Sequence, residues 1–246
     1  MNKISTGSGS RRSRPSIARL AGIVALGVGA LALQRFAHSA ETATRIPAPA
    51  QDEKVVATHS ETAVFSGGCF WGVQGVFEHV RGVEQVASGY TGGAASTAHY
   101  GSVEDGNTGH AESVQITYDP TQITYGRLLQ IFFSVAHDPT ELNYQGPDHG
   151  TQYRSAVFPV NQDQRNVAEA YIAQLGQAHA FPAPVVTRVE QFKGFYPAEA
   201  YHQNYLALHP NDPYIAINDL PKVANLKKVF PDLYLNAPVL LKNIAS

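Results

Sequence analysis

The chain has 246 residues, with 18 Lys and Arg against 20 Asp and Glu, so its formal net charge at pH 7 is −2. This length fits one domain plus a short additional segment, and the hydrophobic content of 43% is ordinary for a globular protein. The nearly balanced charge excludes the broad basic surface that nucleic-acid binding needs, so nucleic acid is not expected as a partner.

Residues 1–40 have the pattern of an export leader. A basic stretch without acidic residues precedes an apolar run, Leu20–Leu33, that contains no charged or polar side chain. The run fits the roughly 7–15 residues of a signal-peptide core better than the about 20 residues of a membrane-spanning helix. Cleavage can follow Ser39 or Ala40, and an uncleaved membrane anchor remains the alternative. We therefore expect an exported, periplasmic protein that uses general secretion or, because Arg11 and Arg12 are adjacent, twin-arginine export.

Residues 41–60 differ in composition from what precedes and follows them. They are rich in Ala, Thr and Pro, carry scattered charges and show no apolar period. Such a stretch is typical of a flexible tether. We therefore expect residues 61–246 to form the folded domain.

The chain has a single cysteine, Cys69, so no internal disulfide can form. In an exported protein an unpaired Cys suggests a reactive thiol, although a buried, unreactive Cys is the commoner alternative. A strand signal at 63–65 is broken by Gly67 and Gly68, and apolar residues then recur at helical spacing, at Phe70, Val73, Phe77 and Val80. Cys69 would lie at the N-terminus of this helix, where free N–H groups and the helix dipole favour a thiolate. The two glycines would allow a sharp bend and a close approach of substrate.

A strand is predicted at 110–118, where side chains alternate in polarity. Glu112 shares the more apolar face with Val114, Ile116 and Tyr118. A carboxyl group on that face would be partly desolvated, which raises its pKa and favours the protonated form. An exposed surface glutamate remains the alternative.

The rest of the chain predicts further helices and strands of a mixed α+β domain. In chain order these are a helix capped by Thr124, a strand at 155–160, a helix opened by a capping box of Asn161 and Gln164, a strand at 185–189, and a short helix that starts at Pro197 and bears His202. Strands that alternate with helices would allow an open sheet of the βαβ type.

The segment Gly68–Gly72, with the sequence Gly-Cys-Phe-Trp-Gly, resembles the signature of the A-type methionine sulfoxide reductases. Further segments match this family in the same order: Gly89–Gly93, Gly109–Glu112, Tyr118–Pro120, His137–Pro139, Asp148–Ser155, His202–Gln203 and Pro213–Ile215. The resemblance implies a peptide-methionine (S)-S-oxide reductase, which repairs oxidised proteins under oxidative stress and also reduces free methionine sulfoxide. It also implies a small mixed β-sheet flanked by helices, a ferredoxin-like two-layer sandwich, with long coil segments at the C-terminal end.

The resemblance assigns roles to residues at matching positions. Cys69 corresponds to the nucleophile that attacks sulfur and becomes a sulfenic acid, and Glu112 to the acid that protonates the sulfoxide oxygen. The remaining positions are the oxygen-binding tyrosines Tyr100 and Tyr153, the walls that hold the S-methyl group, Phe70 and Trp71, and the pocket-shaping Asp148. These residue types suit the chemistry, because the oxygen of a sulfoxide leaves only if it is protonated while a soft nucleophile attacks.

The absence of a second cysteine distinguishes this chain from many relatives, which carry resolving cysteines near the C-terminus. The tail resembles the branch of the family that lacks them, so an internal disulfide relay is excluded. The expected reductant is therefore an external thiol, either a thioredoxin-like protein or a small thiol. No cofactor is expected. No metal is expected either, because the histidines lack metal-binding spacing and no second Cys is present.

Two other classes of protein remain as alternatives. A cysteine hydrolase also places its nucleophile at a helix start beside an aromatic residue, but it needs a His base and an acyl-oxyanion hole. The second alternative is a membrane-tethered binding module in which Cys69 is inert. Only the reductase interpretation predicts conversion of methionine sulfoxide to methionine with a simple dithiol.

Overall fold

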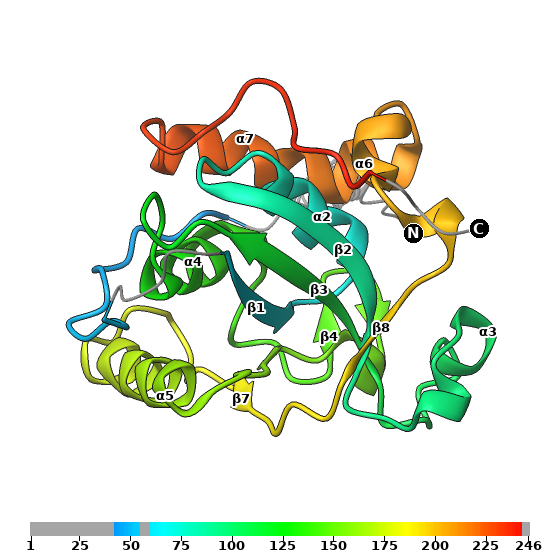
Figure 1. The fold of residues 1–246 in the computed structure, drawn as a ribbon, viewed down its shortest axis with the longest axis horizontal. Coiled ribbons are helices and arrows are strands. Elements are labelled where there is room, and N and C mark those ends of the chain that lie inside the picture. Colours follow the sequence, from blue (N-terminus) through cyan, green and yellow to red (C-terminus); the bar gives the residue numbers. More distant parts are fainter. Residues whose placement is uncertain (1–41, 55–59, 243–246) are drawn as a thin grey trace, which may run out of the picture. The chain divides into compact units, whose positions relative to one another are not determined.

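The computed structural model describes residues 42–54 and 60–242, so the expected leader, 1–40, lies outside the described part of the chain. Figure 1 shows helices and strands that alternate along the chain. The helices are α2 (Phe70–Glu78), α3 (Tyr100–Val103), α4 (Tyr125–Ile131), α5 (Gln162–Gln177), α6 (Tyr205–Leu208) and α7 (Leu220–Val229). The strands are β1 (Glu61–Ser66), β2 (Val83–Thr91), β3 (Ala111–Tyr118), β4 (Tyr144–Gln145), β5 (Asp148–His149), β6 (Ala156–Val157), β7 (Arg188–Val189) and β8 (Phe195–Pro197).

The main sheet has the strand order β7-β6-β1-β3-β2-β8. All neighbouring strands are antiparallel except β6 and β7, which are parallel. The four strands β6-β1-β3-β2, with α2 after β1 and α4 after β3, form the split βαβ arrangement of ferredoxin-like folds. The expected mixed sheet flanked by helices is therefore confirmed. The expected open sheet of the βαβ type takes this split form, because β3 lies between β1 and β2 and pairs antiparallel with both.

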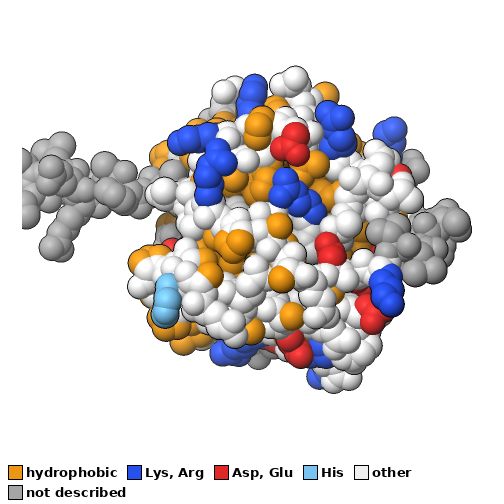
Figure 2. Space-filling model, turned by 90° about the vertical axis from the view of Figure 1, so that its left-hand side faces the viewer, with side chains coloured by type: hydrophobic (Ala, Val, Ile, Leu, Met, Phe, Trp, Pro, Cys, Tyr) orange, Lys and Arg blue, Asp and Glu red, His pale blue; other side chains and the backbone are white. Residues whose placement is uncertain are grey.

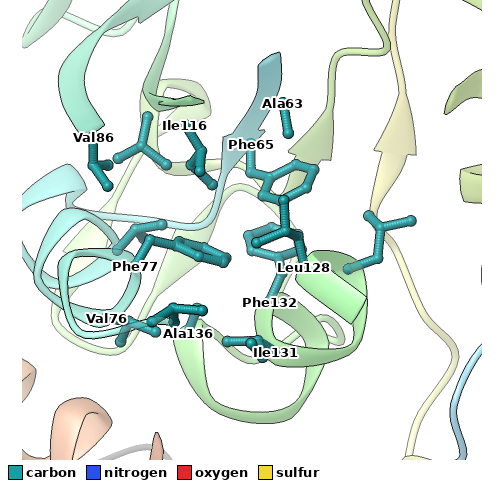
Figure 3. Packing of buried hydrophobic residues seen from close by; sticks show 14 of the residues in the cluster. Ala63, Phe65, Val76, Phe77, Val86, Ile116, Leu128, Ile131, Phe132 and Ala136 are labelled. Atoms are coloured by element: carbon teal, nitrogen blue, oxygen red, sulfur yellow. The ribbon is translucent and has the colours of Figure 1, made fainter. Parts of the chain in front are cut away.

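The main core lies between one face of the sheet and the helices. Figure 3 shows Phe65 of β1 close to Phe77 of α2 and Leu128 of α4, and all three side chains are fully buried. The Phe65 ring also stacks on Phe132, with 5.0 Å between the ring centroids. Val64 points to the opposite face and belongs to a smaller cluster, as the alternation of side chains in a strand requires.

Both expected helix caps form. The Thr124 hydroxyl accepts a hydrogen bond from Arg127 N, and the Asn161 side chain accepts one from Gln164 N. The capping box is modified, because the Gln164 side chain accepts from Val160 N instead of Asn161 N. Helix α4 continues into a π-helical turn, Phe132–Ala136.

Three C-terminal expectations need correction. The strands expected at 155–160 and 185–189 are two-residue strands, β6 and β7. Pro197 ends the edge strand β8 and does not start a helix, and His202 lies in the 3-10 turn Ala200–His202. Proline is compatible with β8 because this strand pairs on one side only, with β2.

Residues 42–54, expected to belong to a flexible tether at 41–60, instead lie along α4 and α5. Ile46 O accepts a hydrogen bond from Gln130 Nε2 at 2.9 Å, and Pro47 O accepts one from Tyr171 Oη at 2.7 Å. Asp52 Oδ1 accepts a third from Gly126 N. The composition of residues 42–54 did not reveal this docking, because the hydrogen-bond donors belong to residues of α4 and α5 that are far away in the sequence. Residues 55–59 lie outside the described part.

The surface carries charges of both signs. Figure 2 shows basic and acidic side chains scattered among apolar and polar ones over the face drawn there. Such mixing fits the formal net charge of −2. None of the helices in residues 42–54 and 60–242 is long and apolar enough to cross a bilayer.

Candidate active site

A cavity of about 180 Å³ opens beside the N-terminus of α2. It is lined by Cys69, Phe70, Trp71, Tyr100, Glu112, Asp148, Tyr153 and Tyr214. The structure thus brings all seven residues singled out in the sequence around one space. Sequence reasoning did not select the eighth, Tyr214.

The antiparallel pairing of β1 with β3 explains why Cys69 meets Glu112. Phe65 is in register with Val114, so the C-terminal end of β1 lies beside the N-terminal end of β3. Glu112 is the second residue of that strand, and its Oε2 accepts a hydrogen bond from Phe70 N at 3.0 Å. The carboxyl group therefore accepts a hydrogen bond from one of the N–H groups at the start of α2 that have no partner within the helix.

The turn before Cys69 depends on its glycines. Gly68 has φ +85°, and a Cβ atom there would lie 2.5 Å from Gln145 Cβ. A Cβ on Gly67 would lie 2.9 Å from the Phe132 ring. The expected sharp bend is thus present, but the groups that approach these glycines closely belong to the protein itself.

Cys69 is the N-cap residue of α2 and is 8% exposed. Burial raises the pKa of its thiol, and the nearby carboxyl groups of Glu112 and Asp219 raise it further, while the backbone N–H of Trp71 opposes them. The shift in the thiol pKa is therefore upward, opposite to the direction expected from the helix N-terminus alone. One backbone N–H does not offset burial next to two acidic groups.

Glu112 is only 4% exposed, which rules out the surface alternative. Burial raises the pKa of its carboxyl group to about 8, although the hydrogen bond from Phe70 N lowers it. A group with this pKa is mostly protonated at neutral pH and can donate a proton. Because Oε2 accepts from the backbone, Oε1 is the oxygen free to carry the proton.

Two tyrosines supply neutral hydroxyl groups. Tyr100 begins α3, and its backbone N–H donates to Glu199 Oε1 at 2.9 Å. Tyr153 precedes Arg154, a buried side chain that donates to Gly109 O and Thr151 O and so fixes the turn. Burial raises the pKa of both phenols, so both remain protonated donors at neutral pH.

The apolar wall of the cavity consists of Phe70 and Trp71, whose ring centroids are 6.5 Å apart. Phe70 is buried, whereas Trp71 is half-buried and stacks on Tyr205, with 3.9 Å between the centroids and 11° between the planes. Its Nε1–H donates to His202 Nδ1 at 3.2 Å. The wall is therefore held from behind by residues of the C-terminal segment.

Asp148 and Tyr214 close the remaining side. The Tyr214 hydroxyl donates to Asp148 Oδ2, and its ring meets Trp71 edge-on at 82°. Burial raises the pKa of the Asp148 carboxyl group. Tyr214 was missed although Pro213–Ile215 matched the family, because nothing in that short match indicated which side chain would face Cys69.

The histidines of the family motifs bind backbone and side-chain groups. His137 lies between Phe132 O and Ser155 Oγ, at 3.1 and 2.7 Å. His110 Nε2 lies 2.9 Å from Ala94 O. Within the described ranges no group of three or more His, Cys, Asp or Glu residues could hold a metal ion.

The arrangement combines a soft nucleophile, a protonated acid, two neutral hydroxyl donors and an aromatic wall around a small cavity. Such a site can polarise and protonate an oxygen while Cys69 attacks the atom that bears it. An apolar substituent of that atom would fit against the aromatic wall.

Comparison with known proteins gives a consistent result. The family model for peptide methionine sulfoxide reductase matches residues 61–233. A peptide methionine sulfoxide reductase MsrA 2 from Mesorhizobium japonicum is 63% identical over 190 residues, covering 77% of this chain and 97% of the relative. A protein of the same name from Synechocystis is 47% identical over 212 residues, 85% of this chain and 96% of the relative.

Solved structures with a similar fold include Mxr1 from Saccharomyces cerevisiae in reduced form, with a TM-score of 0.55 and 30% identity. That alignment covers 70% of this chain and 93% of the yeast chain. Methionine sulfoxide reductase A of Corynebacterium diphtheriae gives a TM-score of 0.52 at 30% identity and covers 73% and 91%.

Proposed function

Because this chain belongs to the peptide methionine sulfoxide reductase family and reduces methionine sulfoxide, we propose that Cys69 removes the oxygen and Glu112 supplies the proton. The observation that carries this proposal is that the nucleophile and the acid lie at the same cavity. Cys69 and Glu112 line one small cavity, and burial raises the pKa of the Glu112 carboxyl group to about 8. At neutral pH the Glu112 carboxyl group therefore carries the proton that it would donate.

The proposed step balances without a cofactor. The Cys69 thiol and the sulfoxide give a sulfenic acid on Cys69 and the methionine thioether. The oxygen moves from the substrate sulfur to Cys69 Sγ, so the substrate sulfur is reduced by two electrons and the Cys69 sulfur is oxidised by two. Glu112 protonates the sulfoxide oxygen as the S–O bond weakens, and the thiol proton replaces the one that Glu112 gave. Burial raises the pKa of the Cys69 thiol, so Cys69 enters this step as a thiol that can return a proton to Glu112.

The neighbouring side chains fit the substrate groups. The hydroxyl groups of Tyr100 and Tyr153 are neutral donors for the sulfoxide oxygen. Phe70 and Trp71 form an apolar surface for the S-methyl group. Asp148, held by Tyr214, shapes the opposite side of the pocket.

We expect selectivity for the S epimer of methionine sulfoxide. Fixed oxygen donors and a fixed methyl wall define separate directions around a chiral sulfur, so only one epimer presents its sulfur to Cys69. Turnover with dithiothreitol, measured on each free epimer, tests both the activity and this geometry. Conversion of neither epimer would reject the function, and equal rates on both would reject the selectivity.

Regeneration must use a thiol from outside the chain, because the sequence contains no second cysteine. We propose that an external thiol condenses with the sulfenic acid, with loss of water, and that a second thiol then releases Cys69. A thioredoxin-like protein or a small thiol fits this role. Cys69 is 8% exposed and lines the cavity, so the cavity is the route of attack.

Intact mass after treatment with excess methionine sulfoxide and no reductant should show one added oxygen that dimedone traps. A small thiol should replace this oxygen by a mixed disulfide, which adds the mass of the thiol less two hydrogens. Excess oxidant without thiol should instead give the irreversible sulfinic acid. A species that gains no oxygen although methionine is formed would contradict the sulfenic acid intermediate.

Export to the periplasm also remains our proposal. It is supported by the basic stretch and the apolar run Leu20–Leu33 in the sequence. N-terminal sequencing of the mature protein, recovered by fractionation, would show cleavage near Ser39 or Ala40. A full-length cytosolic protein would contradict export.

A further inference from the structure

The 3-10 turn Ala200–His202, together with the preceding Glu199, contacts both sides of the cavity from behind. Glu199 Oε1 accepts a hydrogen bond from Tyr100 N at 2.9 Å, and Glu199 Oε2 accepts one from Tyr90 Oη at 2.9 Å. Tyr90 is fully buried in β2, so Glu199 ties the start of α3 to the sheet. This contact fixes the backbone that carries the Tyr100 hydroxyl group.

His202 holds the opposite side of the cavity. Its Nδ1 accepts a hydrogen bond from Trp71 Nε1 at 3.2 Å, and the side chain is almost fully buried. Since the indole N–H can only donate, His202 has its lone pair on Nδ1 and its proton on Nε2. That Nε2 lies 4.0 Å from Glu199 Oε2, so the two side chains face one another.

The His202 ring also fills the space behind the pocket. Its centroid lies 5.0 Å from that of Phe70, 4.7 Å from Tyr100 and 4.2 Å from Tyr201. His202 is therefore in contact with a residue of the proposed methyl wall and with a proposed oxygen donor at the same time. A side chain in this place can fix the distance between them.

We propose that Glu199 and His202 are positioning residues that set the distance between the methyl wall at Trp71 and the oxygen donor Tyr100, and thereby the epimer preference. The inference rests on the proposed function. Neither side chain lines the cavity, so both act through residues that do. Their loss should therefore weaken substrate binding, slow the chemical step moderately and reduce epimer discrimination, without removing the chemistry of Cys69 and Glu112.

Two substitutions at His202 separate positioning from packing. His202→Phe keeps an aromatic ring among Phe70, Tyr100 and Tyr201 but offers Trp71 no acceptor. His202→Asn loses the ring but can place its Oδ1 near the position of Nδ1. We expect KM for the S epimer to rise about five- to tenfold in His202→Phe and less in His202→Asn, as loss of one hydrogen bond predicts. A purely structural histidine would give the opposite order.

Trp71 is the only Trp in the chain, so its fluorescence reports on the wall without turnover. His202→Phe should shift the Trp71 emission and increase its quenching by acrylamide, whereas His202→Asn should stay closer to wild type. His179→Asn is the matched control, because His179 is exposed at the end of α5 and its φ of 45° suits Asn.

At Glu199, the Ala variant removes both hydrogen bonds, whereas Gln keeps an acceptor for Tyr100 N. We expect Glu199→Ala to lower the single-turnover rate constant about tenfold and the preference for the S epimer by a similar factor, and Glu199→Gln to retain most of both. Glu104→Gln, at an exposed carboxyl group just after α3, is the control. If wild type reduces the S epimer but Glu199→Ala and His202→Phe match it in KM, rate and epimer ratio, this inference fails while the proposed function stands. If wild type reduces neither epimer, the proposed function itself fails.

Discussion

Replacement of Cys69 by Ser is expected to abolish the reduction of methionine sulfoxide, with no turnover above the rate in buffer. A serine hydroxyl group fits the same N-cap position but cannot accept the sulfoxide oxygen to form a sulfenic acid, and no second thiol exists in the chain to take over. Turnover with dithiothreitol and intact mass after substrate treatment should both show an inert protein.

The control for the Ser variant is its folded state. The change is small, so the thermal midpoint and the Trp71 emission should stay close to those of wild type. A variant that is folded and still converts methionine sulfoxide at an appreciable rate would show that Cys69 is not the nucleophile.

Replacement of Glu112 by Gln is expected to slow sulfenic acid formation by about 10²–10⁴-fold, the usual range for loss of a general acid. Gln keeps the size of the side chain and can still accept the hydrogen bond from Phe70 N, so substrate affinity should change little. Rapid-quench single turnover gives the rate constant, and the substrate dependence of that rate gives the affinity. A rate constant close to wild type would reject the acid role.

Stability measurements test the protonation of Glu112 independently. Burial raises its pKa from 4.5 to about 8, so the folded state prefers the neutral carboxyl group. The stability that Glu112 contributes is therefore complete below pH 4.5 and is lost as the pH rises through about 8, by roughly 4–5 kcal/mol if the whole shift is realised. The free energy of unfolding of Glu112→Gln minus that of wild type should thus be more positive at pH 9 than at pH 5. Glu78, whose pKa burial also raises to about 8, is present in both proteins and cancels in this comparison.

Local features of the fold were the most predictable from the sequence. The helix at Phe70 and the caps at Thr124 and Asn161 depend on neighbouring residues, and all three are present. The alternation in β3 allowed a buried or an exposed Glu112, and the family match favoured the buried acid that the structure shows. In each case the information lies within about ten residues of the feature.

Features that depend on distant segments were not predictable in the same way. Tyr214 reaches the cavity only because the chain after β8 returns to α2, and the contacts of Glu199 arise for the same reason. The docking of residues 42–54 depends on donors in α4 and α5. Burial and three carboxyl groups remote in the sequence, of Glu112, Asp219 and Asp148, raise the pKa of the Cys69 thiol, so the helix N-terminus alone indicated the wrong direction of shift.

The long return of the chain to α2 has a consequence for how the enzyme matures. Phe70 and Glu112 are 42 residues apart, but Trp71 and His202 are 131 residues apart. Contacts of such sequence separation form late, because a long loop must close before they contribute free energy. A chain that is still being synthesised therefore contains Cys69 before it contains the segment that buries and orients the site. In such a chain Cys69 is an ordinary accessible thiol, open to unwanted mixed disulfides, and selectivity for methionine sulfoxide begins only when the last quarter of the protein has folded over it.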